Sequence, residues 1–340
     1  MAAFKQTFIA LLLASLAACG GKGEDGKKGD GKSADAHAEE DAPKPKPKRI
    51  GGNDRPKTIA EATEGPSRVA LWLVEDEDTK VYILGTIHLM SSKVEWTNPQ
   101  IDRAFAEADA VYLEADFFGK KAQRAMGVVV TQNAEYPDSG RMSSDLEKEA
   151  KEEIKYALKN INLDFSDFDG YRPWFATIQT MSYAVVESGG DPTFAADVVI
   201  ASDMAARGTP LRYLETALHH INIRAAVPDD LYKPYYFELI KDLKYGEAYF
   251  ADLMGAWYKG DMTRLNHVIN GVMDHHPELK ELVLTRSNVE WSRQLDRLLT
   301  DETGTYVVAV SADHVVGEYS IQNQLGRRGY EVERMIPTEG

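Results

Sequence analysis

The chain has 340 residues, of which 54 are acidic and 39 are lysine or arginine, so its formal net charge is −15. A chain this acidic repels the phosphates of nucleic acids and the anionic headgroups of membranes, which argues against either as an electrostatic partner. Its only cysteine is Cys19, so the chain by itself forms neither an internal disulfide nor a zinc-thiolate site.

Residues 1–18 have the pattern of a secretory signal peptide, in which Lys5 precedes the apolar core Phe8–Leu13. The small residues before Cys19 resemble a bacterial lipobox. This resemblance implies that Cys19 is the lipidated first residue of a cell-envelope lipoprotein. Gly20 in the next position favours the outer membrane, with the protein facing the periplasm. An ordinary signal peptide with an incidental cysteine is the alternative.

Residues 19–65 are rich in Gly, Lys, Asp, Glu and Pro, and they contain the alternating segment Pro43–Lys48. Such a segment buries too little apolar surface to offset the entropy that is lost on ordering, so we expect a disordered linker. Residues 66–340 are long enough for one large domain, which the linker would tether to the membrane through the lipid alone.

This domain begins with two apolar runs, Arg68–Val74 and Lys80–Ile87, separated by an acidic spacer of turn length, which predicts an antiparallel hairpin. His88 follows the second run. After a helix capped by Asn98, another apolar run leads to Glu114. The strands of such a unit are most often parallel neighbours, and ligands bind outside their carboxyl ends. His88 and Glu114 are therefore expected at one edge of the sheet.

The remaining elements are helices and short strands. We predict helices at 120–131, 144–160 with Ser144 as its cap, 173–188, 193–206, most of 229–291, and 316–325. A strand at Pro210–Thr216 carries Glu215 near its end, and a second buried strand, Tyr306–Val310, leads to His314. The aromatic residues of 229–291 either pack between helices or line a cleft. The predicted fold class is α/β (α+β), with a mixed central β-sheet made from two similar halves and flanked by many helices.

Two histidines and a carboxylate form a common ligand set for Zn, Mn, Co or Fe. A divalent ion held in this way activates water for hydrolysis without a nucleophile from the protein. His88, Glu114 and His314 would supply the set if the fold brings them together. A histidine at the end of a strand is also often a hydrogen-bonded core residue, which is the alternative for both histidines.

Several motifs, taken in chain order, resemble the TraB/PrgY/GumN family. They are Leu84–His88, Leu113–Asp116, Pro173–Trp174, Arg207–Pro210 with Leu214–Thr216, and Val310–His314 with Val316–Gly317. The family is related to the Tiki metalloproteases and, more distantly, to erythromycin esterase and the haem-binding ChaN lipoproteins. The resemblance implies a divalent metal such as Mn, Co or Zn and the cleavage of peptide bonds.

By position, the resemblance implies that His88, Glu114 and His314 are the metal ligands, with Glu114 and Glu215 as catalytic residues. Glu215 would be a fourth ligand or a general base, or it would only accept hydrogen bonds at the sheet edge. The residues that would line the site are Gly85, Arg286, Asn288 and Asp313. The other histidines, which are His219, His220, His267, His275 and His276, are weaker candidates for a functional role.

Two positions depart from the family pattern. Ser311 stands where the second motif usually has glycine, and its side chain would crowd the close backbone approach that glycine permits. The helix that usually carries Glu-Arg-Asn reads Arg286-Ser287-Asn288, so Asn288 keeps its place while Arg286 is one position out of register.

The sequence therefore predicts a lipid-anchored, metal-dependent hydrolase that acts on a peptide or protein and has no nucleic-acid partner. The alternative is a non-catalytic lipoprotein that binds haem or another ligand on the same fold.

Overall fold

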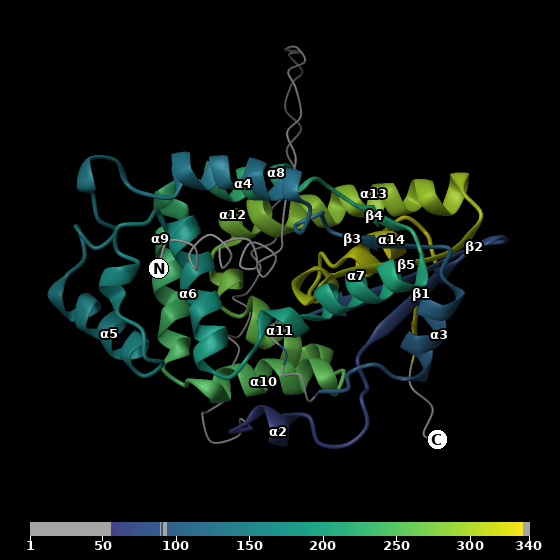
Figure 1. The fold of residues 1–340 in the computed structure, drawn as a ribbon, viewed down its shortest axis with the longest axis horizontal. Helices are drawn as coiled ribbons and strands as arrows, with labels where there is room; N and C mark the ends of the chain where they lie inside the picture. Colours follow the sequence, from purple (N-terminus) through teal and green to yellow (C-terminus); the bar gives the residue numbers. More distant parts are fainter. Residues whose placement is uncertain (1–55, 89, 91–93, 336–340) are drawn as a thin grey trace, which may run out of the picture.

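The structure, a computed structural model, describes residues 56–88, 90 and 94–335 (Figure 1). The expected signal peptide, Cys19 and the linker up to residue 55 lie outside these residues. Helix α2 (Ile59–Ala62), which the sequence analysis placed in the linker, packs its buried apolar side chains against α10 (Glu247–Tyr258). Across the described residues, no helix combines the length and the apolar character needed to cross a bilayer.

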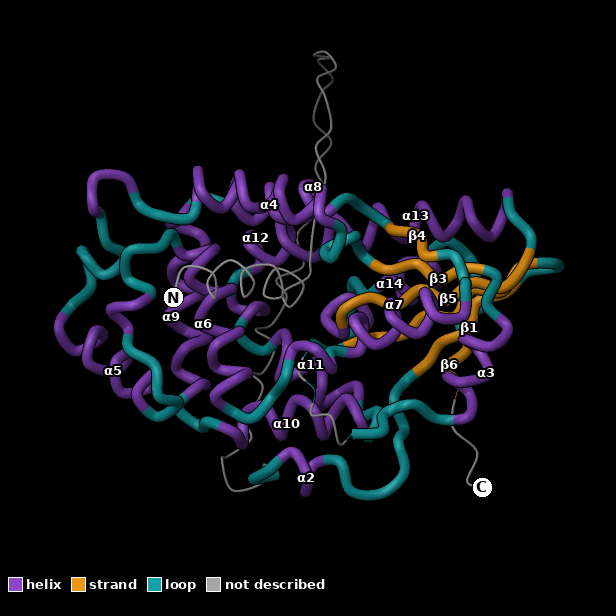
Figure 2. Tube along the Cα trace, in the orientation of Figure 1, coloured by secondary structure: helices purple, strands orange, loops and turns teal. Residues whose placement is uncertain are grey.

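Among the described residues, six strands form one mixed sheet in one half of the molecule (Figure 2). In spatial order they are β4 (Leu211–Tyr213), β3 (Ala110–Leu113), β5 (Gly304–Ser311), β2 (Thr79–Thr86), β1 (Leu71–Glu75) and β6 (Glu333–Met335). The first four run parallel to one another, whereas β1 pairs antiparallel with both β2 and β6. The predicted α/β class, mixed sheet and hairpin are thus confirmed.

The expectation that β2 and β3 are neighbours is wrong. The two strands are parallel, but β5 lies between them and pairs with both. Tyr306–Val310 takes this central place because it is apolar and buried along its whole length, as strands covered on both faces are. The carboxyl end of β5, which leads to His314, therefore lies between the ends that lead to His88 and Glu114.

The helices cover both faces of the sheet and fill the other half of the molecule (Figures 1 and 2). Their bounds are α3 (Pro99–Glu107), α4 (Lys120–Asn133), α5 (Lys148–Lys159), α6 (Pro173–Glu187), α7 (Ala196–Arg207), α8 (Ala217–Ala226), α9 (Asp229–Leu243), α11 (Met262–Asn270), α12 (Pro277–Lys280), α13 (Arg286–Asp301) and α14 (Ile321–Arg327). A short 3-10 turn, η8 (Ala312–Val315), follows β5 and carries His314.

Alternation along the strands divides the sheet side chains between two apolar layers. Ile83 and Val308 belong to a cluster with the apolar residues of α13 and α14. Leu84 and Val307 belong to the opposite cluster, which includes residues of α3, α7 and α10. Both faces of the sheet are therefore covered, and its carboxyl edge is left facing the helical half of the molecule.

Two predicted elements are shorter than expected because local hydrogen bonds end them. The helix expected from Ser144 starts four residues later as α5, since the buried carboxylate of Asp169 holds a turn by accepting 2.8 Å hydrogen bonds from the backbone N–H and the hydroxyl of Ser143. Strand β4 stops early because Thr216 is the N-cap of α8.

Candidate functional site

Gly85 allows the turn that carries His314 to approach β2. A Cβ atom at Gly85 would overlap the Cγ2 atom of Val315 in η8, so only glycine fits without a shift of this turn. The carbonyl oxygen of Gly85 also accepts a 2.7 Å hydrogen bond from Nε1 of Trp257 in α10. Gly85 therefore shapes the site through packing and through its backbone.

His88 lies just beyond β2 and is oriented by a carboxylate from α7. Its Nδ1 is 2.9 Å from Oδ1 of Asp197, whereas its Nε2 is buried and has no hydrogen-bond partner among the described residues. Burial lowers the pKa of His88, but the charge and hydrogen bond of Asp197, followed by the charges of Glu114 and Asp313, outweigh it and raise the pKa to about 9. A carboxylate at one imidazole nitrogen is how proteins commonly orient the other nitrogen toward a metal.

Glu114 follows β3 and is buried at the same sheet edge. Its Oε1 accepts a 2.6 Å hydrogen bond from the backbone N–H of Ser311, while Oε2 is buried without a hydrogen-bond partner in the described part of the chain. Burial and then the charge of Asp313 raise the pKa of Glu114 to about 8, against the opposing effects of Ser311 and His88. Burial therefore favours the uncharged form of this carboxyl group, and a cation beside it favours the carboxylate.

His314 is completely buried in η8. Its Nδ1 is 2.5 Å from Oδ1 of Asn288, and the ring centroid of Trp291 lies 4.5 Å from that of the imidazole. The amide of Asn288 is fixed in turn, because its Nδ2 donates a 2.9 Å hydrogen bond to the carbonyl oxygen of Tyr319. These contacts from α13 direct Nε2 of His314 toward Glu114, whose Oε1 is 3.7 Å away.

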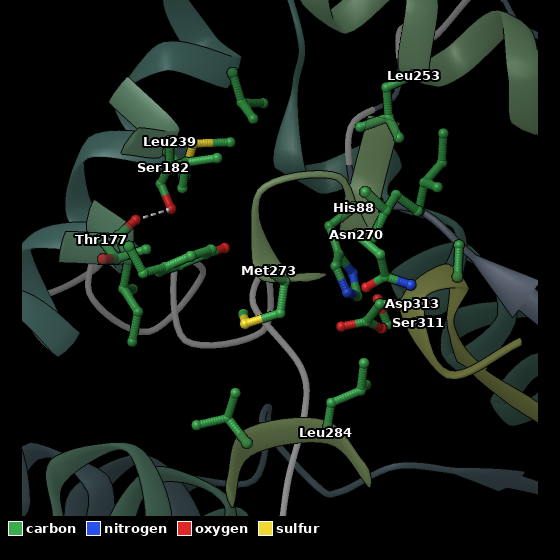
Figure 3. Close-up of a pocket in the computed structure, with 18 of the residues that line it drawn as sticks. His88, Thr177, Ser182, Leu239, Leu253, Asn270, Met273, Leu284, Ser311 and Asp313 are labelled. Atoms are coloured by element: carbon green, nitrogen blue, oxygen red, sulfur yellow. Dashed lines mark hydrogen bonds between the residues drawn. The ribbon is translucent and has the colours of Figure 1, made fainter. Parts of the chain in front are cut away.

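A mostly apolar cavity of about 190 Å³ opens beside these groups. His88, Asp313 and Asn270 lie together on one side of it, and Leu239 projects from the helices on the opposite side (Figure 3). Some of the aromatic residues predicted to line a cleft or pack between helices, namely Tyr235, Tyr249 and Phe250, line this cavity, and Tyr232 lines it with them. The strand ends thus supply the polar groups, and the helices supply an apolar pocket.

Asp313 lies where the polar strand ends meet this cavity. Its Oδ1 is buried and has no hydrogen-bond partner among the described residues. Burial raises the pKa of Asp313 to about 6, against the hydrogen bond from Ser311 and the charges of Arg224 and His88. A pKa near neutral suits a group that takes up and releases a proton. The neighbouring Ser311 has a φ of −54°, which any residue adopts, and it also lines the cavity.

Glu215 and Arg286 are placed differently from the groups above. Glu215 lies beside Glu114, since its backbone N–H donates to the Glu114 carbonyl at 2.8 Å, but its carboxylate binds Nδ1 of His220 at 2.7 Å. Arg286 lies apart from the site on α13, where its side chain is half exposed and pairs with Glu281. The structure therefore brings together the predicted residues from the strand ends, and it leaves Arg286 at the surface.

The buried atoms without a hydrogen-bond partner among the described residues include several at these strand ends, namely Thr86 Oγ1, His88 Nε2, Glu114 Oε2 and Asp313 Oδ1. An unsatisfied buried polar atom costs about 1–3 kcal/mol, so several of them at one place call for an explanation, and a bound ligand is one. Imidazole nitrogen and carboxylate oxygen are the donor types that suit Zn, Mn or Co. With the side chains as they stand, however, no three or more His, Cys, Asp or Glu residues of the described chain form a group that could hold an ion. The donor types therefore fit a divalent metal, and binding would need their side chains to adjust.

The Asp197→Asn variant should weaken the binding of a divalent ion by about 10–100-fold, because the amide keeps the shape but loses the charge that orients His88. Calorimetric titration with Mn²⁺ measures this effect. Asp203→Asn is the matched control, since Asp203 is an exposed carboxylate on the same helix that pairs with Arg207. Equal affinities for the wild type and Asp197→Asn would rule out this role for Asp197.

Asp197 and Arg224, two charged residues that line or adjoin the site, were not predicted from the sequence. Both are more than nine-tenths buried, Asp197 in the first turn of α7 and Arg224 in the last turn of α8. A signal was present in the sequence, since Asp197 precedes the apolar run Val198–Ala201 and Arg224 precedes Ala225 and Ala226, and a charge beside apolar residues is rarely buried unless it is paired.

A model of the TraB/PrgY/gumN family matches residues 70–334, which include every strand of the sheet up to the middle of β6 and all the site residues described above. No curated protein and no solved structure matches the chain.

Proposed function

We propose that this chain, which belongs to the TraB/PrgY/gumN family, hydrolyses peptide bonds with the help of a divalent metal ion. One observation carries the proposal: buried imidazole and carboxylate atoms without partners among the described residues gather at the carboxyl ends of β2, β3 and β5, next to an apolar cavity. Perturbed titratable groups that adjoin a cavity are characteristic of active sites.

His88, Glu114 and His314 would hold the ion. When bound, the ion would supply the positive charge that lowers the pKa of a water molecule and polarises a substrate carbonyl. Asp197 and Asn288 would keep the two imidazoles in the orientations that binding requires, because each already occupies the opposite ring nitrogen.

Asp313 is the group to which we assign the proton transfer. It lines the cavity and has a buried oxygen without a hydrogen-bond partner among the described residues. It would accept a proton from the attacking water and deliver it to the departing amine, so that one water adds across the bond. Glu215 is a weaker candidate for this step, because its carboxylate is bound to His220.

The test is metal analysis and peptide hydrolysis on protein that is purified without chelator. A stoichiometric divalent ion is expected, and hydrolysis should stop with chelator and return with Mn²⁺, Co²⁺ or Zn²⁺. Haem titration in parallel covers the alternative function. A Soret band together with the absence of any metal requirement would contradict the hydrolase and favour a haem-binding protein.

A further inference from the structure

Arg224 is a buried cation in the wall of the cavity. Its side chain lines the same space as His88 and Asp313, and only 6% of the residue is exposed. Its Nη1 atom is buried and has no hydrogen-bond partner among the residues that the structure describes. Removing a guanidinium group from water is costly unless an anion pairs with it, and no ion pair of Arg224 is formed within the described part of the chain.

The other shielded arginines of the chain show what Arg224 is missing. Arg264 binds Asp252 through two hydrogen bonds of 2.8 and 2.6 Å, and Arg172 binds Asp229 at 3.0 Å. Asp313 is near enough for the charge of Arg224 to act on it, but no ion pair joins the two among the described contacts. Among the described contacts, Arg224 therefore lacks the carboxylate partner that Arg264 and Arg172 have, and it lines the cavity.

The surroundings of Arg224 limit what its partner can be. The phenols of Tyr232 and Tyr235 line the cavity with it, and the rest of the wall is mostly apolar: Ile178, Leu239, Leu253, Ile269, Met273 and Leu284. An apolar cavity of about 150 Å³ is enough to bind a benzene ring, so about 190 Å³ accepts one apolar side chain. A ligand that suits both features has a small anionic group attached to an apolar body.

We propose that Arg224 binds the α-carboxylate of a peptide and that the cavity takes the apolar side chain of the same C-terminal residue. The planar guanidinium fork matches the two oxygens of a carboxylate, which would satisfy the unpartnered Nη1. Arg224 lines the same cavity as His88 and Asp313, so a peptide whose carboxylate is held by Arg224 would have its last peptide bond within the space that these two residues also line. This assignment rests on the proposed hydrolase function, and it makes the enzyme one that removes apolar residues from free carboxyl ends.

The experiment compares two probes that differ only in charge, N-acetyl-leucine and its amide, by calorimetric titration of the full chain. The wild type should bind the carboxylate about tenfold or more tightly than the amide. Arg224→Met should remove this preference, and Arg224→Lys should keep part of it. Arg293→Met is the control, since Arg293 is an exposed arginine of α13 that pairs with Glu290.

The outcomes test the role of Arg224 in carboxylate binding separately from the proposed hydrolysis of peptide bonds. Equal binding of both probes by the wild type, binding of neither, or an unchanged preference in Arg224→Met would overturn the role of Arg224. If Arg224→Met does not fold, the wild-type comparison and Arg224→Lys still decide. A carboxylate preference that depends on Arg224, without hydrolysis under any metal, would support this site while contradicting the hydrolase. Metal-dependent hydrolysis without a preference for the carboxylate probe would support the hydrolase and contradict the role of Arg224.

Discussion

Replacing His88 with alanine is expected to abolish metal binding and peptide hydrolysis together, and replacing His314 should have the same effect. Each imidazole has one nitrogen held by a neighbour. The other nitrogen of His88 is buried without a hydrogen-bond partner among the described residues, and that of His314 lies 3.7 Å from Oε1 of Glu114. Removal of a direct ligand should cost more than the about 10–100-fold loss expected for a supporting residue. Metal analysis and hydrolysis of the same preparations measure both effects.

The control for these variants is His275→Ala. The side chain of His275 is half exposed and binds Glu238, so its loss should leave metal content and hydrolysis unchanged. Circular dichroism establishes that each variant is folded before it is compared. Full activity, or a stoichiometric metal ion, in folded His88→Ala or His314→Ala would contradict the proposed site.

A large loss of stability is expected when the ion pair between Asp252 and Arg264 is broken. Asp252 of α10 and Arg264 of α11 form a buried pair with two hydrogen bonds, and α10 also supplies the indole that binds the Gly85 carbonyl. Asp252→Ala leaves the guanidinium buried without its carboxylate, so the free energy of unfolding should fall by about 3–5 kcal/mol. Urea unfolding followed by circular dichroism measures the change.

Two further variants test the cause of that loss. Replacing both partners, as Asp252→Leu with Arg264→Met, should recover most of the stability, because no unpaired charge is left buried. Glu290→Ala breaks an exposed pair with Arg293 and should cost at most about 1 kcal/mol. A loss below about 1 kcal/mol for Asp252→Ala would mean that water reaches Arg264.

The fold class could be predicted because the central strands are marked by apolar runs. Val81–Leu84 and Tyr306–Val310 are buried throughout, and runs of this length rich in β-branched residues are typical of strands covered on both faces. Their order in the sheet was not predictable in the same way. Local pattern favours the pairing of consecutive strands, whereas the insertion of β5 depends on contacts between residues that are far apart in the chain.

For the candidate site, the residues at the strand ends could be predicted from the sequence, whereas their partners from the helices could not. The histidines and Glu114 stand at strand ends, so the sheet alone brings them to one edge. Their orienting partners come from helices, Asp197 from α7 and Asn288 from α13. Of these, Asn288 was expected at the site only from the family resemblance, because which helical residue faces a strand end is set by packing that no local pattern contains.

The central position of β5 also determines how the molecule can assemble. Gly304–Ser311 is synthesised close to the end of the chain, yet it joins two strands that are made much earlier. Until it arrives, β2 and β3 each present an open edge, where wrong pairing and aggregation begin, and such distant partners meet slowly. A chain truncated before Gly304 loses the middle of its sheet rather than a dispensable border, so shortened products of proteolysis or premature termination would have no native structure to adopt.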